Sequence, residues 1–158
     1  MIPINPLNER LTLVGRALAP LAMRVGLAVP FFPSGLTKWD GLGILSPSAA
    51  YLFSDEFRLH LFGATVPFPA PQVFAYVDGV LEITLPILLI VGLGTRLSAL
   101  ALLIMTGVIE LVVPDAWETY HLPWAAMALG LLALGAGPLS LENLLRRRFS
   151  RDDTAEDR

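Results

Sequence analysis

The chain has 158 residues, of which 54% are hydrophobic and 16% are charged, and its formal net charge is −3. Soluble domains are usually about 45–50% apolar and about 25% charged, so both values indicate a membrane protein. The absence of cysteine excludes disulfides, thiolate metal sites and iron–sulfur clusters formed by this chain. The length fits one small domain. We expect no nucleic-acid partner, since the one basic tract, residues 146–148, has a better explanation.

The first apolar stretch, residues 11–39, predicts a membrane-spanning helix, because about 20 residues suffice to cross the hydrocarbon core. Arginines interrupt it too often for a cleaved signal peptide, so we interpret it as a retained helix. Pro30 and Pro33 remove backbone donors near its outer end, where we expect a kink or local unwinding. Lys38 and Trp39 then follow at the membrane interface.

The connection over residues 40–71 predicts a segment that touches the membrane without crossing it. Ser46 followed by Pro47 is typical of a helix start, and we expect a short helix over residues 47–62. This helix is too apolar for a solvated loop and too short to span, which favours an interfacial or re-entrant position. The prolines that follow predict extended backbone over residues 63–71.

Three further apolar runs complete the predicted fold. Residues 72–93 and 96–113 predict the second and third spans, joined by a tight glycine-containing turn. Residues 122–139 predict the fourth, with small residues that permit close packing and through which two copies could form a homodimer. We therefore expect an all-α, four-helix transmembrane bundle over residues 1–145, followed by a charged tail over residues 146–158.

The distribution of basic residues predicts the orientation. One side of the membrane collects only Lys38 and Arg58, whereas the other collects seven arginines: Arg10, Arg16, Arg96, Arg146, Arg147, Arg148 and Arg151. Because Lys and Arg are enriched on the cytoplasmic side, both termini should be cytoplasmic. We interpret residues 146–148 as a topology signal, with recruitment of anionic lipid as a secondary role.

Three carboxylates lie inside the predicted spans. Asp78 and Glu82 are four residues apart and share one helix face. Pro86 cannot donate to the carbonyl of Glu82, which leaves a polar backbone group beside that carboxylate. Glu110 enters from the third span near the same outer surface. Charges at membrane depth cost roughly 2.5–3.5 kcal/mol each, so they usually mark a working site. The three acids are candidates for proton handling.

Five further residues are candidates for ligand binding. Arg24 and Lys38 could orient a ligand headgroup, with Trp39 beside them, or could pair with the acids and fix helix register. His60 and His121 both fall on the outer side. Their spacing matches no metal-binding motif, and we predict no metal site. Structural ion pairing, proton or quinone chemistry, and binding of another ligand or a metal remain open at this point.

The sequence also resembles a known family. The SGLTK stretch of residues 34–38, the glutamate–proline stretch of residues 82–86 and the GLGTR stretch of residues 92–96 together resemble the DoxX family of small four-helix bacterial integral membrane proteins. The resemblance extends over residues 26–145. It implies a multi-pass protein of the bacterial inner membrane and marks Lys38, Glu82 and Arg96 as signature positions.

The resemblance suggests two functions. Some relatives are membrane subunits of a thiosulfate:quinone oxidoreductase, which implies quinone as a ligand and an oxidoreductase subunit as a partner. In that reading Glu82 and Asp78 handle protons, and Arg24 or Lys38 orients the quinone headgroup near the outer leaflet. The alternative is a non-catalytic membrane anchor, or a small-ligand or metal-stress-associated binding protein, that recruits a partner. The sequence contains no cofactor motif, and it leaves open whether the chain is an enzyme.

Overall fold

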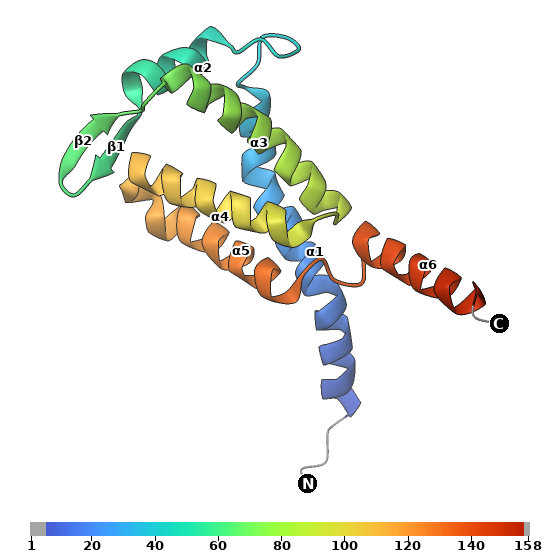
Figure 1. Ribbon diagram of the computed structural model, residues 1–158. Coiled ribbons are helices and arrows are strands. Elements are labelled where there is room, and N and C mark those ends of the chain that lie inside the picture. Colours follow the sequence, from blue (N-terminus) through green and yellow to red (C-terminus); the bar gives the residue numbers. More distant parts are fainter. Residues whose placement is uncertain (1–5, 157–158) are drawn as a thin grey trace.

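The computed structural model describes residues 6–156, with side chains through Arg148. The described part is mostly helical (Figure 1). In chain order it contains α1 (Pro6–Leu36), α2 (Pro47–Tyr51), the π-helical turn η1 (Leu52–Glu56), β1 (Arg58–Leu61), β2 (Ala64–Pro67), α3 (Pro71–Val91), α4 (Thr95–Val112), the 3₁₀ turn η2 (Pro114–Ala116), the π-helical turn η3 (Trp117–His121), α5 (Leu122–Leu134) and α6 (Leu141–Glu156).

Three helices, α1, α3 and α4, are long and apolar enough to cross a membrane, with 31, 21 and 18 residues. Their outward faces carry large apolar side chains that no other part of the described chain covers, among them Val29, Ile87 and Ile104, which are 60%, 45% and 61% exposed. Water-soluble proteins rarely expose so much contiguous apolar surface. Lipid is therefore the natural surrounding of these helices.

The predicted fourth span is shorter than expected. We predicted a helix over residues 122–139, but α5 ends at Leu134 and has 13 residues. Gly135 and Gly137 follow with positive φ angles of 74°, a left-handed geometry that ends the helix. The turns η2 and η3 precede α5 directly and lengthen its helical path. By length and composition the described residues thus contain three candidate spans, and the fourth stays a prediction.

The helices pack around α1. It lies against α3 and α5, while α4 packs against α3 and α5, and the N-terminal turns of α1 extend beyond the other helices (Figure 1). The core of the bundle is made of aliphatic and aromatic side chains from all four helices, including Leu27, Phe31, Leu89, Leu102 and Leu131, each at most 2% exposed. This packing fixes α1 beside α3, which matters for the site described below.

Two glycines let α1 and α3 come close together. A Cβ atom on Gly35 would lie 2.8–2.9 Å from the Cβ and carbonyl carbon of Glu82 and from Ile83. A Cβ atom on Gly79 would lie 2.9–3.1 Å from Trp39 and Lys38. Small residues of this kind allow close backbone approach between membrane helices.

We predicted a kink or local unwinding at the outer end of α1, and the structure contains no unwinding there. The helix continues through Pro30 and Pro33 to Leu36. These prolines remove only the donors to Gly26 and Val29, and the surrounding turn is held by buried Leu27, Ala28 and Phe31. Packing against neighbouring helices therefore preserves the helical backbone where the local sequence predicted a kink or unwinding.

A small two-stranded sheet corrects both the all-α prediction and the predicted helix over residues 47–62. The helix starts as expected, with the Ala49 N–H donating to Ser46 Oγ at 3.2 Å, but it ends at Glu56. Strands β1 and β2 then pair antiparallel, and Leu61 faces Ala64. Phe62 and Gly63 form the turn with φ angles of 50° and 84°, the geometry that two-residue hairpins favour.

Candidate functional site

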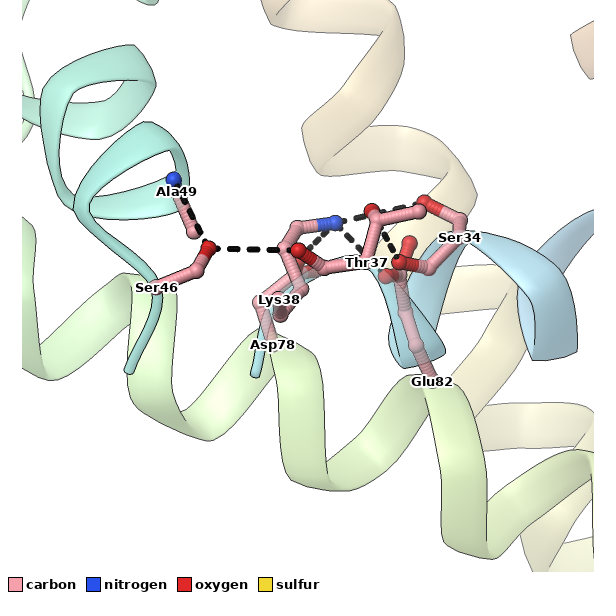
Figure 2. Close-up of polar contacts among 7 residues, drawn as sticks. All are labelled: Ser34, Thr37, Lys38, Ser46, Ala49, Asp78 and Glu82. Atoms are coloured by element: carbon pink, nitrogen blue, oxygen red, sulfur yellow. Dashed lines mark hydrogen bonds and ion pairs between the residues drawn. The ribbon is translucent and has the colours of Figure 1, made fainter. Parts of the chain in front are cut away.

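The buried carboxylates of α3 meet one lysine. Lys38 Nζ lies 2.7 Å from Glu82 Oε2 and 3.3 Å from Asp78 Oδ2, and it donates to Ser34 Oγ at 3.2 Å. Figure 2 shows these side chains converging from the end of α1 and from α3. The side chains of Lys38 and Glu82 are 9% and 6% exposed, and that of Asp78 is 22% exposed. We call Ser34, Lys38, Asp78 and Glu82 the Lys38 cluster.

The SGLTK stretch explains how Lys38 is placed. Ser34 and Lys38 are four residues apart, so they lie over one another at the end of the helix. Gly35 gives α1 its close approach to the backbone at Glu82. Beyond α1, Ser46 fixes the chain twice: its N–H donates to the Lys38 carbonyl at 2.8 Å and its hydroxyl to the Thr37 carbonyl at 3.2 Å (Figure 2).

The α3 side of the cluster is fixed by helix geometry. Asp78 and Glu82 share one face because they are four residues apart, and α3 continues without interruption through Pro86. Since Pro86 has no N–H, the carbonyl of Glu82 lacks its usual helical donor. The backbone beside the Glu82 carboxylate is therefore an additional acceptor.

The charges of the cluster do not balance. An ammonium has three N–H donors, and Lys38 directs them at Ser34, Glu82 and Asp78. Two carboxylates face one ammonium, so the cluster carries either a net negative charge or one additional proton. The remaining carboxylate oxygens can accept hydrogen bonds. This arrangement suits a partner that brings a proton or a hydrogen-bond donor.

The cluster forms one patch in the lining of a cavity of about 220 Å³. Because its four members are bonded to one another or share α3, they form a single polar region. The rest of the lining is apolar and largely aromatic: Phe31, Phe53, Phe57, Phe68 and Trp124, with valines and an isoleucine of α4. An apolar pocket with a few convergent polar groups is typical of a small-molecule site.

Glu110, the third predicted acid, lies outside the Lys38 cluster. Its Oε2 is 2.5 Å from His121 Nδ1, and His121 itself is 2% exposed. The His121 ring packs against Trp124, with ring centroids 5.4 Å apart, and Trp124 lines the cavity. The predicted cluster of three acids therefore separates into the Lys38 cluster and a Glu110–His121 pair that supports the cavity wall.

Arg24 does not contact the acids, which corrects its predicted role. Its guanidinium is buried and donates to four backbone carbonyls: Leu89 at 2.6 Å, Ile90 at 2.5 Å, Ala136 at 3.0 Å and Leu139 at 2.8 Å. They belong to the last turn of α3 and to the segment after α5, where helix ends leave carbonyls with free acceptor capacity. Arg24 thus joins three parts of the chain at the end of the bundle opposite the Lys38 cluster.

Trp39 and His60 also lie outside the cavity. Trp39 packs edge-on against Tyr76, with centroids 5.1 Å apart, and lines a groove on the other side of α3. His60 is exposed on β1, with its Nδ1 3.0 Å from the carbonyl of Leu111. His121 and His60 thus contact Glu110 and Leu111, two successive residues at the end of α4. Within residues 6–156 no group of three or more His, Cys, Asp and Glu side chains is arranged to hold a metal.

Sequence reasoning missed the aromatic wall and Ser34. Phe53 and Phe57 are four residues apart, which places them together, and their rings lie 5.2 Å apart. The ring of Phe68 lies 5.4 Å from that of Phe53, and Phe68 directly follows β2, the second strand of the hairpin. The spacing of Ser34 and Lys38 was a usable signal, whereas nothing local in the sequence indicated that Phe68 folds back onto Phe53.

The fold and the cluster define a helical membrane protein with a polar, ion-paired patch in an apolar cavity. The DoxX family model matches residues 19–115, a stretch that contains Lys38, Asp78 and Glu82. The chain belongs to the DoxX family. It is similar to an uncharacterized protein of Haemophilus influenzae, 30% identical over 155 residues, which covers 86% of this chain and 89% of that protein. No solved structure matches it.

Proposed function

We propose that the protein binds the headgroup of a quinone or quinol in the cavity beside the Lys38 cluster, as a membrane subunit of a redox system. The observation that supports this is the position of the cluster in a lining that is otherwise apolar and aromatic. Aromatic side chains offer ring-stacking surfaces to a planar ligand. The convergent polar groups would fix its orientation.

The size of the cavity suits a one-ring ligand. Engineered apolar cavities of roughly 150 Å³ hold a benzene molecule. At about 220 Å³ this cavity is somewhat larger, so it has room for a ring with oxygen substituents. It lies below the range for drug-sized ligands, which begins at about 300 Å³. A compact headgroup therefore fits better than a large cofactor.

The hydrogen bonds within the cluster favour the reduced form of the ligand. Lys38 donates hydrogen bonds to Ser34 and Glu82 and is ion-paired with Asp78, so a quinone carbonyl would compete with these groups for the ammonium. A quinol hydroxyl, in contrast, can donate to a free carboxylate oxygen of Asp78 or Glu82. Oxidation of a quinol releases two protons and two electrons. Asp78 and Glu82 would each accept one of the two protons, and the two electrons would pass to a partner oxidoreductase subunit.

The membrane arrangement is part of the same proposal. With η2, η3 and α5 together as a fourth crossing, both termini lie on the cytoplasmic side of the bacterial inner membrane. The cavity then lies in the outer half of the bilayer. The charge distribution supports this, because Arg10, Arg16 and Arg96 lie at the end opposite Lys38.

A second function has its own supporting observation. The ammonium of Lys38 contacts three protein groups, two by hydrogen bonds and one as an ion pair, as expected of a structural contact that locks α1 to α3. In that case the protein is a non-catalytic membrane anchor that recruits a partner. It would bind no quinol in this cavity, and loss of Glu82 would change only stability or assembly.

Titration with a quinone separates the two functions. Quinones quench tryptophan fluorescence at short range, and Trp124 lines the cavity. A short-chain ubiquinone should quench the purified protein saturably, the matching quinol should reverse the quenching by competition, and Trp124→Phe should remove the saturable component. Glu82→Gln should weaken binding of the quinol more than that of the quinone. Unsaturable quenching in the wild type, with Glu82→Gln affecting only the unfolding temperature, would favour the anchor.

A further inference from the structure

A second cavity, of about 420 Å³, lies at the end of the bundle opposite the Lys38 cluster. Three arginines from distant parts of the sequence line it: Arg96 from the first turn of α4, and Arg146 and Arg147 from α6. The segment between α5 and α6 lines the cavity between Arg96 and the two arginines of α6. The convergence of three guanidinium groups on one cavity is independent of the site proposed above.

None of the three arginines forms an ion pair with a described carboxylate. Among the described side chains, the ion pairs are Lys38 with Asp78 and with Glu82, and His121 with Glu110. Arg96 makes one long hydrogen bond, 3.4 Å, to the carbonyl of Ala133. Glu142 also lines the cavity and contributes one carboxylate against three guanidinium groups. The lining therefore keeps a formal charge of +2.

The start of α6 adds to the positive potential. This helix has 16 residues, and Ser140, Glu142 and Asn143 of its start line the cavity. The Asn143 N–H donates to Ser140 Oγ, and the Glu142 N–H donates to the Gly92 carbonyl at 3.0 Å. These bonds fix the helix start beside the α3–α4 turn. The positive end of the helix dipole thus faces the same cavity as the arginines.

The cavity also lies at the boundary of the apolar surface. Leu134, 60% exposed, lines it, and Leu97, 73% exposed, directly follows Arg96. α4 is one of the candidate spans, so its first turn marks the level at which the hydrocarbon ends. An anion bound here would have apolar surface on one side and guanidinium groups on the other. A soluble anion would make use of the guanidinium groups only.

We propose that this cavity binds the phosphate of an anionic phospholipid, with Arg96, Arg146 and Arg147 as the phosphate ligands. Guanidinium groups bind phosphate oxygens in a bidentate, charge-assisted geometry. The acyl chains would run along the exposed leucines of α4 and α5. The lipid would hold the start of α6 against the turn between α3 and α4.

Native mass spectrometry of the detergent-purified protein tests this. The probes are phosphatidylglycerol and phosphatidylcholine with identical acyl chains, and inorganic phosphate as a soluble competitor. The wild type should retain phosphatidylglycerol in preference to phosphatidylcholine. Arg146→Gln/Arg147→Gln should weaken the apparent affinity for phosphatidylglycerol about thirtyfold, and Arg96→Gln severalfold. Inorganic phosphate should not displace the lipid.

A matched control removes the same charge outside the cavity. Arg148 belongs to the same arginine run and Arg10 lies near the start of α1, and neither lines the cavity. Arg10→Gln/Arg148→Gln should leave the lipid preference unchanged. Equal weakening in both double variants, equal retention of the two lipids, or full displacement by inorganic phosphate would overturn the proposal. If the Arg146/Arg147 variant does not fold, Arg96→Gln provides the same comparison against Arg148→Gln.

Discussion

Lys38 and Glu82 form a buried ion pair, with Nζ 2.7 Å from Oε2, between the turn that follows α1 and the middle of α3. The contact brings together residues 44 positions apart. Both side chains are at least nine-tenths buried. Removing one partner of such a pair leaves an uncompensated charge, which is more damaging than removing both.

Lys38→Met should therefore lower the free energy of unfolding by about 3–5 kcal/mol, because Asp78 and Glu82 lose their shared cation. Lys38→Met combined with Glu82→Gln should be less destabilised than Lys38→Met alone. Chemical unfolding in detergent, arranged as a double-mutant cycle, measures the coupling. Strictly additive effects of the two substitutions would show that the pair does not hold α1 to α3.

Gly35→Ala tests the close approach of the two helices. The added Cβ would lie 2.8–2.9 Å from backbone and Cβ atoms of Glu82, which cannot rotate away. We expect a loss of about 1–3 kcal/mol in unfolding free energy and a longer distance from Lys38 to Glu82. Gly15→Ala, in the same helix with nothing within 4 Å of the new Cβ, is the control and should be neutral or stabilising. Similar effects at both positions would contradict the close contact.

Arg24→Met should be among the most destabilising single substitutions in the chain. It removes a donor from four carbonyls, two at the end of α3 and two after α5, although the Leu89 carbonyl keeps the Gly92 N–H. Hydrogen bonds from charged groups contribute about 1.5–3 kcal/mol each, so a loss of more than about 3 kcal/mol is expected. Arg24→Lys should restore only part of it, because an ammonium lacks the planar fork. Arg16→Met, on the exposed face of α1, should have little effect on the unfolding temperature.

The Lys38 contact could be anticipated from the sequence, and the Arg24 contacts could not. The sequence offered Lys38 or Arg24 as cations for the α3 acids, and Lys38 is the one that reaches them. Arg24 instead bonds to carbonyls 65 to 115 residues away. Local patterns show that a helix end has unpaired carbonyls but do not show which side chain folds against it.

The remaining errors have the same origin. The apolar run that begins at Pro47 has the spacing of a helix, yet residues 58–67 form a hairpin because Phe62 and Gly63 adopt positive φ angles. A phenylalanine rarely adopts that conformation, so no local pattern indicated the turn. Likewise, the end of α5 depends on Gly135 and Gly137, which we had read as packing residues only. In contrast, the membrane character follows from composition, and the long helices follow from the length of the apolar runs. Both were predictable.

Val108→Phe should block the cavity beside the Lys38 cluster. Val108 lines it from α4 and also lines the smaller adjoining cavity of about 140 Å³. A phenyl ring there would occupy space that the quinol headgroup needs, so binding of the short-chain quinol should weaken at least about tenfold. The fluorescence titration with Trp124 as reporter measures this. Val73→Phe, on the exposed face of α3, is the control, and equal loss of binding in both variants would place the ligand elsewhere.

Labelling of single-cysteine variants measures how often the chain crosses the membrane, since the chain has no cysteine of its own. Phe62→Cys lies at the fully exposed tip of the hairpin, and Asn8→Cys and Arg148→Cys lie at exposed positions near the two ends of the described chain. If η2, η3 and α5 complete a fourth crossing, a membrane-impermeant maleimide applied to intact cells should label only the Phe62 variant. Both terminal cysteines should react once the membrane is opened. Labelling of Arg148→Cys in intact cells, with Asn8→Cys still protected, would mean three crossings and would contradict the arginine-lined cavity, because Arg96 and the arginines of α6 would lie on opposite sides of the membrane.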